Sequence, residues 1–468
     1  MKLKTFLVFL YLCISTVLFL SFKAEVIVWI SFFINFLLIT SITYFHLNLE
    51  QTFSPFLTSF IVFFYLFCIV APIIQISSFE FVEPLFPNKY PYRTWDVLFT
   101  NGLIFLFCAT FFISYLLFKK RTNYKVQKTT IKQTVYQAPL VIITLFIICI
   151  VLVTLNFNDI IEDITHSIYT KEIESVSSLL IKTKVLFLIP LGAVVYIISY
   201  LRKSNRITDN IIICFCILIF IILMLLFFKN PLTEKRNALG PIYITLIYML
   251  FPKLINDNAK FFLFMFLSLV IVFPIMSTFT HIDAGLAEVM NEPSLLIDSF
   301  FRFGGVSAAF SSLHYDAFAN IMATLNYVSV HGLSLGYQFL GTLLFFIPRA
   351  IWPSKPTSTG ELVGNHLIDD FGFTYNNLSN SMVSEGYINF GILGVILFAI
   401  LLSYFINIFI KWMKSDSYSK EIIAFYFAVH LIFFLRGDLT NGFTYFIGPL
   451  IAVYFIPKFI EQLFKKSL

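Results

Sequence analysis

The chain has 468 residues, of which 59% are hydrophobic, 19% aromatic and 12% charged, and its formal net charge is +6. Soluble globular proteins carry about 25% charged and about 45–50% apolar residues, so this composition excludes a soluble enzyme, a disordered chain and a secreted disulfide scaffold. It predicts an all-α polytopic membrane protein, because a membrane β-barrel would show alternation rather than long apolar runs. All six cysteines lie inside apolar runs and are interpreted as packing residues.

Twelve apolar runs are long enough to predict transmembrane helices, each of which needs about 20 mostly apolar residues. They lie near residues 5–22, 26–45, 55–76, 96–118, 138–156, 184–201, 210–228, 238–252, 260–279, 387–411, 420–436 and 440–457. A further run at 333–347 is shorter, contains glycines and ends before Pro348, and we interpret it as a re-entrant or interfacial helix. No internal repeat or linker divides the sequence, which predicts a single membrane domain over 1–468.

The charges between these runs predict the topology. If the N-terminus is cytoplasmic, the cytoplasmic segments hold 19 bases and six acids, and the opposite side holds 13 bases and 20 acids. Basic residues concentrate in the cytoplasmic loops of membrane proteins. Both termini are therefore predicted to be cytoplasmic. The two longest loops, 157–183 and 280–386, are predicted to face the periplasm or the cell exterior.

Five arginines fall on the predicted external side: Arg93, Arg236, Arg302, Arg349 and Arg436. The planar guanidinium group binds phosphate oxygens in two places at once and keeps its charge at any pH. Arginines that converge at the membrane surface would suit an anionic lipid headgroup, although bases near helix ends also commonly extend to the interface without binding a ligand. For Arg236, Arg349 and Arg436, which adjoin glycine, proline or asparagine, we favour binding.

The segment FIPRAIWPSKPTSTG at 346–360 is the most specific stretch of the chain. Its three prolines forbid a regular helix, so the backbone is expected to form a stiff loop with many turns. Trp352 suits the membrane interface, and Arg349 and Lys355 place two positive charges close together in sequence. The alternative interpretation is a simple interfacial anchor.

Two further segments carry polar residues at the ends of predicted spans. SNSMVSEGYINFGILGV at 379–395 places Glu385 just before a span, followed by Tyr387. A carboxylate at a helix start is often only a cap that complements the helix dipole. FFLRGDLTNG at 433–442 contains Arg436 and predicts a polar tight turn between the last two spans.

At these segments the sequence resembles the O-antigen polymerase (Wzy) family of oligosaccharide repeat-unit polymerases. The resemblance rests on IPRAIWPSKP at 347–356, SEGYINFG at 384–391, RGDL at 436–439, and the arginine before a span at 236. Arg349 and Gly360 also stand at the R-x10-G spacing described for loops of such polymerases. The predicted topology agrees with the family. The loop after the fifth predicted span has no arginine, which argues against a scheme with two capture-and-release loops.

The resemblance implies a glycosyltransferase of the bacterial inner (plasma) membrane whose active site faces the periplasm. It would move a growing glycan from its polyprenyl-diphosphate carrier onto the non-reducing end of a lipid-linked repeat unit. Departure of the diphosphate needs charge neutralisation, which arginines supply without a metal. The sequence contains no Asp-x-Asp motif or His/Cys cluster, so no metal or other cofactor is predicted. We assign diphosphate or glycan binding to Arg236, Arg302, Arg349, Lys355, Arg436, Trp352 and Tyr387.

A general base would take the proton from the attacking sugar hydroxyl. Glu385 is the first candidate, because it lies near the Arg349 segment in sequence and at the end of a span. Asp316 and His314, both in SSLHYDAF, and His331 are the other candidates. A histidine in a loop is, however, more often an ordinary polar surface residue.

The partners expected from this function are the lipid bilayer, an undecaprenyl-diphosphate-linked donor and acceptor, a chain-length regulator and a flippase, with no nucleic acid. An O-antigen ligase would differ only in its acceptor, which the sequence does not show. A flippase or exporter of lipid-linked oligosaccharides would predict two similar halves and a charged central cavity, and neither is visible in the sequence. A structural or receptor membrane protein is the last alternative.

Overall fold

Helices make up all the regular structure of the described residues in this computed structural model. These residues are 2–79, 90–120, 138–165, 181–203, 209–230, 234, 236–275, 292, 294–302, 310 and 313–466. The predicted all-α class is therefore confirmed for this part of the chain.

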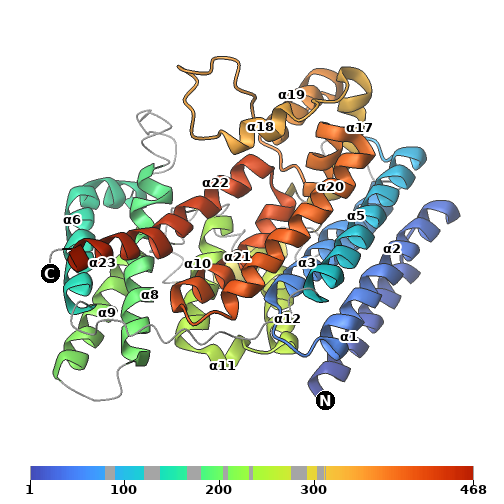
Figure 1. Ribbon diagram of the computed structural model, residues 1–468. Coiled ribbons are helices and arrows are strands. Elements are labelled where there is room, and N and C mark those ends of the chain that lie inside the picture. Colours follow the sequence, from blue (N-terminus) through green and yellow to red (C-terminus); the bar gives the residue numbers. More distant parts are fainter. Residues whose placement is uncertain are drawn as a thin grey trace. The chain divides into compact units, whose positions relative to one another are not determined.

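The α-helices of Figure 1 are α1 (Lys2–Leu20), α2 (Val26–Tyr44), α3 (Pro55–Tyr65), α4 (Ala71–Phe79), α5 (Thr94–Lys120), α6 (Ala138–Thr165), α8 (Ile189–Lys203), α9 (Asp209–Phe228), α10 (Arg236–Leu250), α11 (Pro252–Ile255), α12 (Asn258–Leu267), α15 (Ser294–Arg302), α17 (Ala317–His331), α18 (Tyr337–Leu343), α19 (Thr359–Phe371), α20 (Met382–Met413), α21 (Tyr418–Arg436), α22 (Leu439–Leu450) and α23 (Ile456–Lys466). Short π-helical segments continue several of them, at Phe45–Leu49, Leu66–Val70, Ser268–Val272 and Ile451–Phe455.

Eleven helical stretches of the described residues are long and apolar enough to cross a membrane. They are Leu3–Leu20, Val26–Leu49, Pro55–Ser78, Thr94–Lys120, Ala138–Ile161, Ile181–Lys203, Ile211–Phe228, Asn258–Ile275, Met382–Met413, Tyr418–Arg436 and Leu439–Lys465. Each overlaps one of the predicted spans. The remaining predicted span, 238–252, falls on α10, which has only 15 residues. That helix ends before Phe251, because the residue that precedes a proline disfavours the helical conformation.

Residue contacts group the chain into two compact units. Unit 1 comprises Met1–Asn123, Lys253–Asn407 and Leu431–Gly442. Unit 2 comprises Tyr124–Pro252, Ile408–His430 and Phe443–Leu468.

The core of unit 1 is built around α3, every residue of which is buried. It packs against α2 and α12, and α2 packs in turn against α5. Aromatic rings fill the space between helices, as where Phe60 and Phe111 stack with their centroids 3.8 Å apart. Offset stacked and edge-to-face rings stabilise such contacts beyond the area they bury. Part of the unusually large phenylalanine content therefore serves packing.

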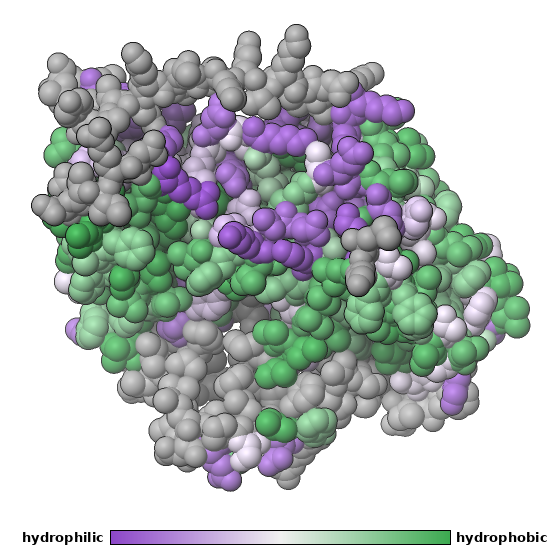
Figure 2. Space-filling model, turned by 90° about the horizontal axis from the view of Figure 1, so that it is seen from below, coloured by the Kyte–Doolittle hydropathy of each residue, from purple (hydrophilic) through white to green (hydrophobic). Residues whose placement is uncertain are grey.

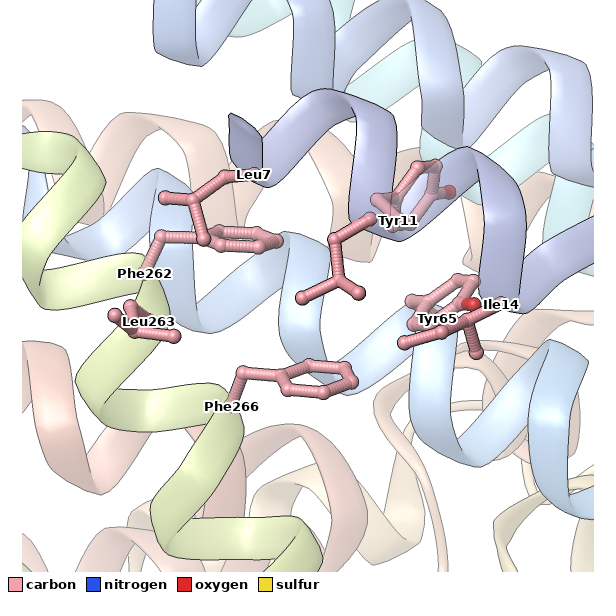
Figure 3. A pocket seen from close by; sticks show the side chains of 8 residues that line it. Leu7, Tyr11, Ile14, Tyr65, Phe262, Leu263 and Phe266 are labelled. Carbon is pink, nitrogen blue, oxygen red and sulfur yellow. The ribbon is translucent and has the colours of Figure 1, made fainter. Parts of the chain in front are cut away.

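Unit 1 also contains a small apolar pocket between α1, α3 and α12 (Figure 3). Leu7, Tyr11 and Ile14 of α1 face Tyr65 and Phe266 across it. The tyrosine hydroxyls form hydrogen bonds with other side chains; the hydroxyl of Tyr65, for example, shares one of 2.8 Å with Ser15. The pocket walls are thus almost wholly hydrocarbon.

In unit 2, α8 is the central helix and packs against α6, α9 and the segment Ile451–Phe455. Two glycines permit close backbone contact within this unit. A Cβ atom at Gly192 would lie 2.1 Å from the carbonyl oxygen of Ala452, and one at Gly448 would lie 1.8 Å from that of Lys184. Side chains at these positions would force the backbones apart.

Large apolar side chains are widely exposed on the spanning helices. Leu20 is 83% exposed, Leu393 75% and Leu155 74%. Figure 2 shows hydrophobic residues over much of one face of the molecule. Exposed apolar surface on this scale is expected where a helix bundle contacts lipid.

Candidate functional site

Two of the predicted site residues, Asp316 and Arg436, form an ion pair in unit 1. Asp316 directly precedes α17 and Arg436 is the last residue of α21. Nη2 of Arg436 lies 3.1 Å from Oδ1 of Asp316, and the hydroxyl of Ser379 donates to the same oxygen at 2.6 Å. The Asp316 side chain is 3% exposed and that of Arg436 21%. The arginine is therefore the accessible member of the pair, and the carboxylate lies behind it.

A phenol completes this group. The hydroxyl of Tyr375 is buried and has no hydrogen-bond partner among the described residues. Burial raises the pKa of Tyr375, Asp316 adds to that rise, and Arg436 opposes it. Buried hydroxyls are normally hydrogen-bonded in folded proteins. The Tyr375 hydroxyl can therefore bond to a water molecule or to a polar ligand.

The polar face of α17 supports the site. Asp316, Asn320 and Thr324 follow one another at intervals of four residues, which places them on one side of a helix. Nδ2 of Asn320 donates to the carbonyl oxygen of Ser379 at 2.6 Å, and Oγ1 of Thr324 donates to Oδ1 of Asn380 at 3.0 Å. These bonds fix the irregular segment that contains Ser379 against α17.

Glu385 is buried in the same unit and holds the start of α22. Its Oε1 accepts a hydrogen bond from the backbone N–H of Leu439 at 2.8 Å and another from the hydroxyl of Thr359. Asp438 caps the same helix, since Oδ1 accepts from the N–H of Asn441 at 2.8 Å. Burial raises the pKa of Asp438, and its hydrogen bonds to Asn441 oppose the rise. Glu385 is thus tied to the turn that follows Arg436.

The motif around Glu385 forms a sharp kink in α20. Phe390 and Gly391 leave the helical conformation, with φ of +62° at Gly391. Gly386 and Gly394 meet across the kink so closely that a Cβ at Gly394 would lie 1.9 Å from the carbonyl oxygen of Gly386. The glycines of this segment therefore set its backbone geometry.

Residues just before the kink bind α18 and the segment that precedes it. The carbonyl oxygen of Ile388 accepts from the N–H of Ser334 at 2.9 Å. Oδ1 of Asn389 accepts from the N–H of Phe339, in the first turn of α18, at 3.2 Å. The segment 333–347, predicted to be re-entrant or interfacial, thus contains a helix of seven residues that is joined to the kink of α20.

The proline-rich segment after α18 is held together by the cations that were predicted to bind ligand. Nη1 of Arg349 donates to the carbonyl oxygen of Lys355 at 2.6 Å. Nζ of Lys355 donates to those of Phe345 and Ile347, at 2.5 and 3.1 Å. Burial and the neighbouring Arg349 lower the pKa of Lys355. Trp352 lies in the same loop and donates from Nε1 to Oγ of Ser354 at 3.1 Å.

The other predicted site residues lie outside this cluster or outside the described side chains. The ring of His314 contacts that of Phe273, with centroids 5.7 Å apart. The ring of Tyr387 contacts Phe99 of α5 at 6.0 Å. Arg236 begins α10 and Arg302 ends α15, and their side chains lie outside the described part of the structure.

No known family model, curated protein or solved structure matches this chain. Function must therefore be argued from the site itself. In the described part of the chain, no three His, Cys, Asp or Glu side chains converge in a group that could hold a metal ion.

Several residues of the site were not predicted from the sequence. Tyr375 and Asn320 lie in no motif, and Ser379 begins the segment 379–395 but was not singled out within it, because the contacts of Asn320 and Ser379 join segments about 60 residues apart in sequence. Asp438 lies in the RGDL motif, two residues after Arg436. Its closeness to that arginine in sequence could have identified it.

A second polar group of unit 1 joins α17 to α19 around His366. Nε2 of His366 lies 2.8 Å from Oδ1 of Asn326, and Nδ1 lies 2.8 Å from Oδ2 of Asp370. His331 is adjacent, with the two imidazole centroids 5.4 Å apart. His366 is buried, whereas Asp370 is half exposed.

This histidine predicts a pH dependence of stability. Burial lowers the pKa of His366 below its ordinary value near 6.5, against an opposing effect of Asp370. The unfolded chain then binds the proton more readily, so stability should fall as the pH drops through about 6.5. In His366→Gln the contribution of this histidine to the slope of stability against pH should disappear. The measurement is thermal unfolding in lipid nanodiscs between about pH 7.5 and 5.5. Equal slopes in the two proteins would contradict this assignment.

Proposed function

We propose that this chain is a membrane glycosyltransferase that polymerises polyprenyl-diphosphate-linked oligosaccharide repeat units, such as those of O-antigen. The contact that supports this proposal best is the ion pair of Asp316 and Arg436. It combines an accessible guanidinium group, suited to a diphosphate, with a shielded carboxylate that can accept a proton.

In this mechanism the diphosphate of the donor lipid binds Arg436 and takes the place of Asp316 as its partner. A hydroxyl oxygen of the acceptor sugar attacks the anomeric carbon of the donor glycan. The bond from that carbon to the diphosphate oxygen breaks, and the polyprenyl diphosphate leaves with the electron pair. Arg436 stabilises its growing negative charge. The released carboxylate of Asp316 accepts the proton of the attacking hydroxyl.

Tyr375 has a separate role in this proposal. Its buried hydroxyl near both charged groups is available to donate a hydrogen bond to a phosphate or sugar oxygen. Glu385 acts as a positioning residue through the N–H of Leu439, rather than as the base first suggested by its place in the sequence. His314 is left without a catalytic role.

The setting we propose is the bacterial inner membrane, with both termini in the cytoplasm and this site at the periplasmic face. The positive-inside distribution of bases supports that orientation. The expected partners are the lipid-linked donor and acceptor, a flippase that supplies them, and a chain-length regulator.

The activity is tested by incubating the purified protein in nanodiscs with lipid-linked repeat units and resolving the products by gel electrophoresis. A ladder of lengthened glycans is expected. A deletion strain distinguishes the related ligase: single repeat units on the cell surface indicate a lost polymerase, whereas the absence of surface glycan indicates a lost ligase. No lengthening by the purified protein, together with absent surface glycan, would overturn the proposal.

A further inference from the structure

Unit 2 contains a row of cations and aromatic rings that the proposed reaction does not use. Trp412, in the last turn of α20, stacks on Tyr454 with the ring centroids 5.8 Å apart. Nζ of Lys420, in the first turn of α21, lies 5.9 Å from the centroid of the Trp412 ring. Nζ of Lys458, in α23, lies 5.2 Å from that of the Tyr454 ring. These distances are typical of cation–π contacts, and the four side chains form a continuous cation–aromatic row.

A third cation of unit 2 has the same setting. Arg202 lies in the last turn of α8, and its guanidinium carbon is 4.4 Å from the centroid of the Tyr418 ring. Tyr418 begins α21, two residues before Lys420. Tyrosine and tryptophan gather where membrane helices meet the headgroups of the bilayer. Cations held over such rings at the ends of spanning helices are therefore expected at the membrane surface.

The carboxylates of the protein do not neutralise the two lysines of the row. Among the described residues, neither Lys420 nor Lys458 forms an ion pair with an acid. Their closest acidic neighbours in sequence, Glu421 and Glu461, are bound to other groups, a tyrosine hydroxyl and another lysine, each at 2.9 Å. The positive charge of the row is thus available to an anion from outside the chain.

A ligand can reach the row without entering a cavity. Lys458 is exposed, and Lys420, Trp412 and Tyr454 are each partly exposed. Phe459, which follows Lys458 on α23, is 61% exposed and adds an apolar surface beside the charge. Binding to an anionic lipid surface strengthens both with the apolar area buried and with the positive charge that faces the headgroups.

We propose that the cation–aromatic row binds the headgroup of an anionic phospholipid of the surrounding bilayer. The flexible stems of Lys420 and Lys458 let both ammonium groups donate to the lipid phosphate. The stacked rings of Trp412 and Tyr454 join the helices that carry these lysines. A zwitterionic headgroup has its own cation beside the phosphate, which the ammonium groups repel, so the row prefers a lipid with net negative charge.

The alternative is that the lysines only extend into water at the membrane surface, as lysines near helix ends commonly do. A solvated ammonium group needs no fixed contact with the protein. Here Lys420 and Lys458 both lie over rings, and the two rings stack on one another. This arrangement holds the two cations near one place on the surface, as a site for a single headgroup requires.

The site is tested on the full-length protein in detergent, titrated with phosphatidylglycerol or with phosphatidylcholine of the same acyl chains. Native mass spectrometry measures the bound lipid, and the wild type should prefer phosphatidylglycerol. Lys420→Gln and, separately, Lys458→Gln should each weaken phosphatidylglycerol binding about fivefold, the effect of one basic residue at an anionic lipid surface. Binding of phosphatidylcholine should not change.

Lys260→Gln is the matched control. Lys260 is an exposed lysine in the first turn of another spanning helix, α12, and it donates to the carbonyl oxygen of Lys253. Its loss should change phosphatidylglycerol binding by less than about twofold, because no comparable set of rings and lysines surrounds it. A loss as large as that in Lys420→Gln would mean a general attraction of positive charge and would overturn the proposal.

Thermal unfolding separates lipid binding from a purely structural role of the row. Phosphatidylglycerol should raise the Tm of the wild type more than phosphatidylcholine does, and both glutamine variants should lose this difference. Lys420→Arg and Lys458→Arg keep the charge and should keep the difference. If the glutamine variants lowered the Tm equally in both lipids and kept the preference of the wild type, the row would be structural and the proposal wrong. Displacement of the lipid by inorganic phosphate would overturn it in favour of a site for free anions.

Discussion

Replacing Arg436 with glutamine should reduce polymer formation by about a hundredfold or more, because the leaving diphosphate loses its charged partner. Glutamine keeps a donor for Asp316, so the variant should fold as the wild type does. The measurement is the rate of glycan lengthening in nanodiscs at saturating acceptor. Arg93→Gln is the matched control: this arginine is exposed and precedes α5 in the same unit, and its loss should leave the rate unchanged.

Asp316→Asn distinguishes this mechanism from a simple loss of structure. The variant should also fail to make polymer, since the base is gone, yet it should bind farnesyl diphosphate more tightly than the wild type does. The reason is that Arg436 no longer has to leave a carboxylate to reach the phosphate. Normal polymer in either variant, or weaker binding in Asp316→Asn, would rule out the roles assigned to this pair.

The largest structural effect is expected at the kink of α20. In Gly394→Ala the new Cβ would lie 1.9 Å from the carbonyl oxygen of Gly386, so the backbone would have to shift to admit it. We expect a loss of about 3 kcal/mol or more in stability, with low yield of folded protein, since overpacking of a tight contact carries a penalty of this order. Thermal unfolding of the detergent-solubilised protein is the measurement.

A glycine in open space provides the control for this substitution. At Gly102, within α5, no atom lies within 4 Å of the position that a Cβ would occupy. Gly102→Ala should therefore be neutral or stabilise the helix by about 1 kcal/mol, the difference in helix propensity. If both variants lost stability equally, the close contact between Gly386 and Gly394 would not be the cause of the loss.

The helical class and eleven of the spans could be predicted from sequence because burial in lipid demands long apolar runs, and such runs are visible without any tertiary information. The ends of the spans were less predictable. The second span continues to Leu49 through a π-helical turn, and the helix at 238–252 is cut short by Pro252. Neither effect depends on hydrophobicity, the property from which the spans were predicted.

Only part of the candidate site could be predicted from the sequence. Asp316 and Arg436 were both named, but their pairing joins residues 120 positions apart and no periodicity reveals it. Arg349 and Lys355 carried the most specific motif, and in the structure their polar groups bind the carbonyl oxygens of their own loop. A motif shows that residue types matter together, but it does not show whether they bind a ligand or one another.

The hydrogen bond from Leu439 to Glu385 has a consequence for biogenesis. A ribosome makes Glu385 well before Leu439, so the nascent helix that carries this acid would reach the translocon with one of its final partners still unsynthesised. An unsatisfied carboxylate is poorly tolerated in hydrocarbon. The first turns of α20 should therefore stay in water, or in the translocon itself, until α22 arrives. Maturation of unit 1 would then have to wait for the synthesis of Leu439, and truncation just before residue 439 should leave a chain that inserts but does not mature.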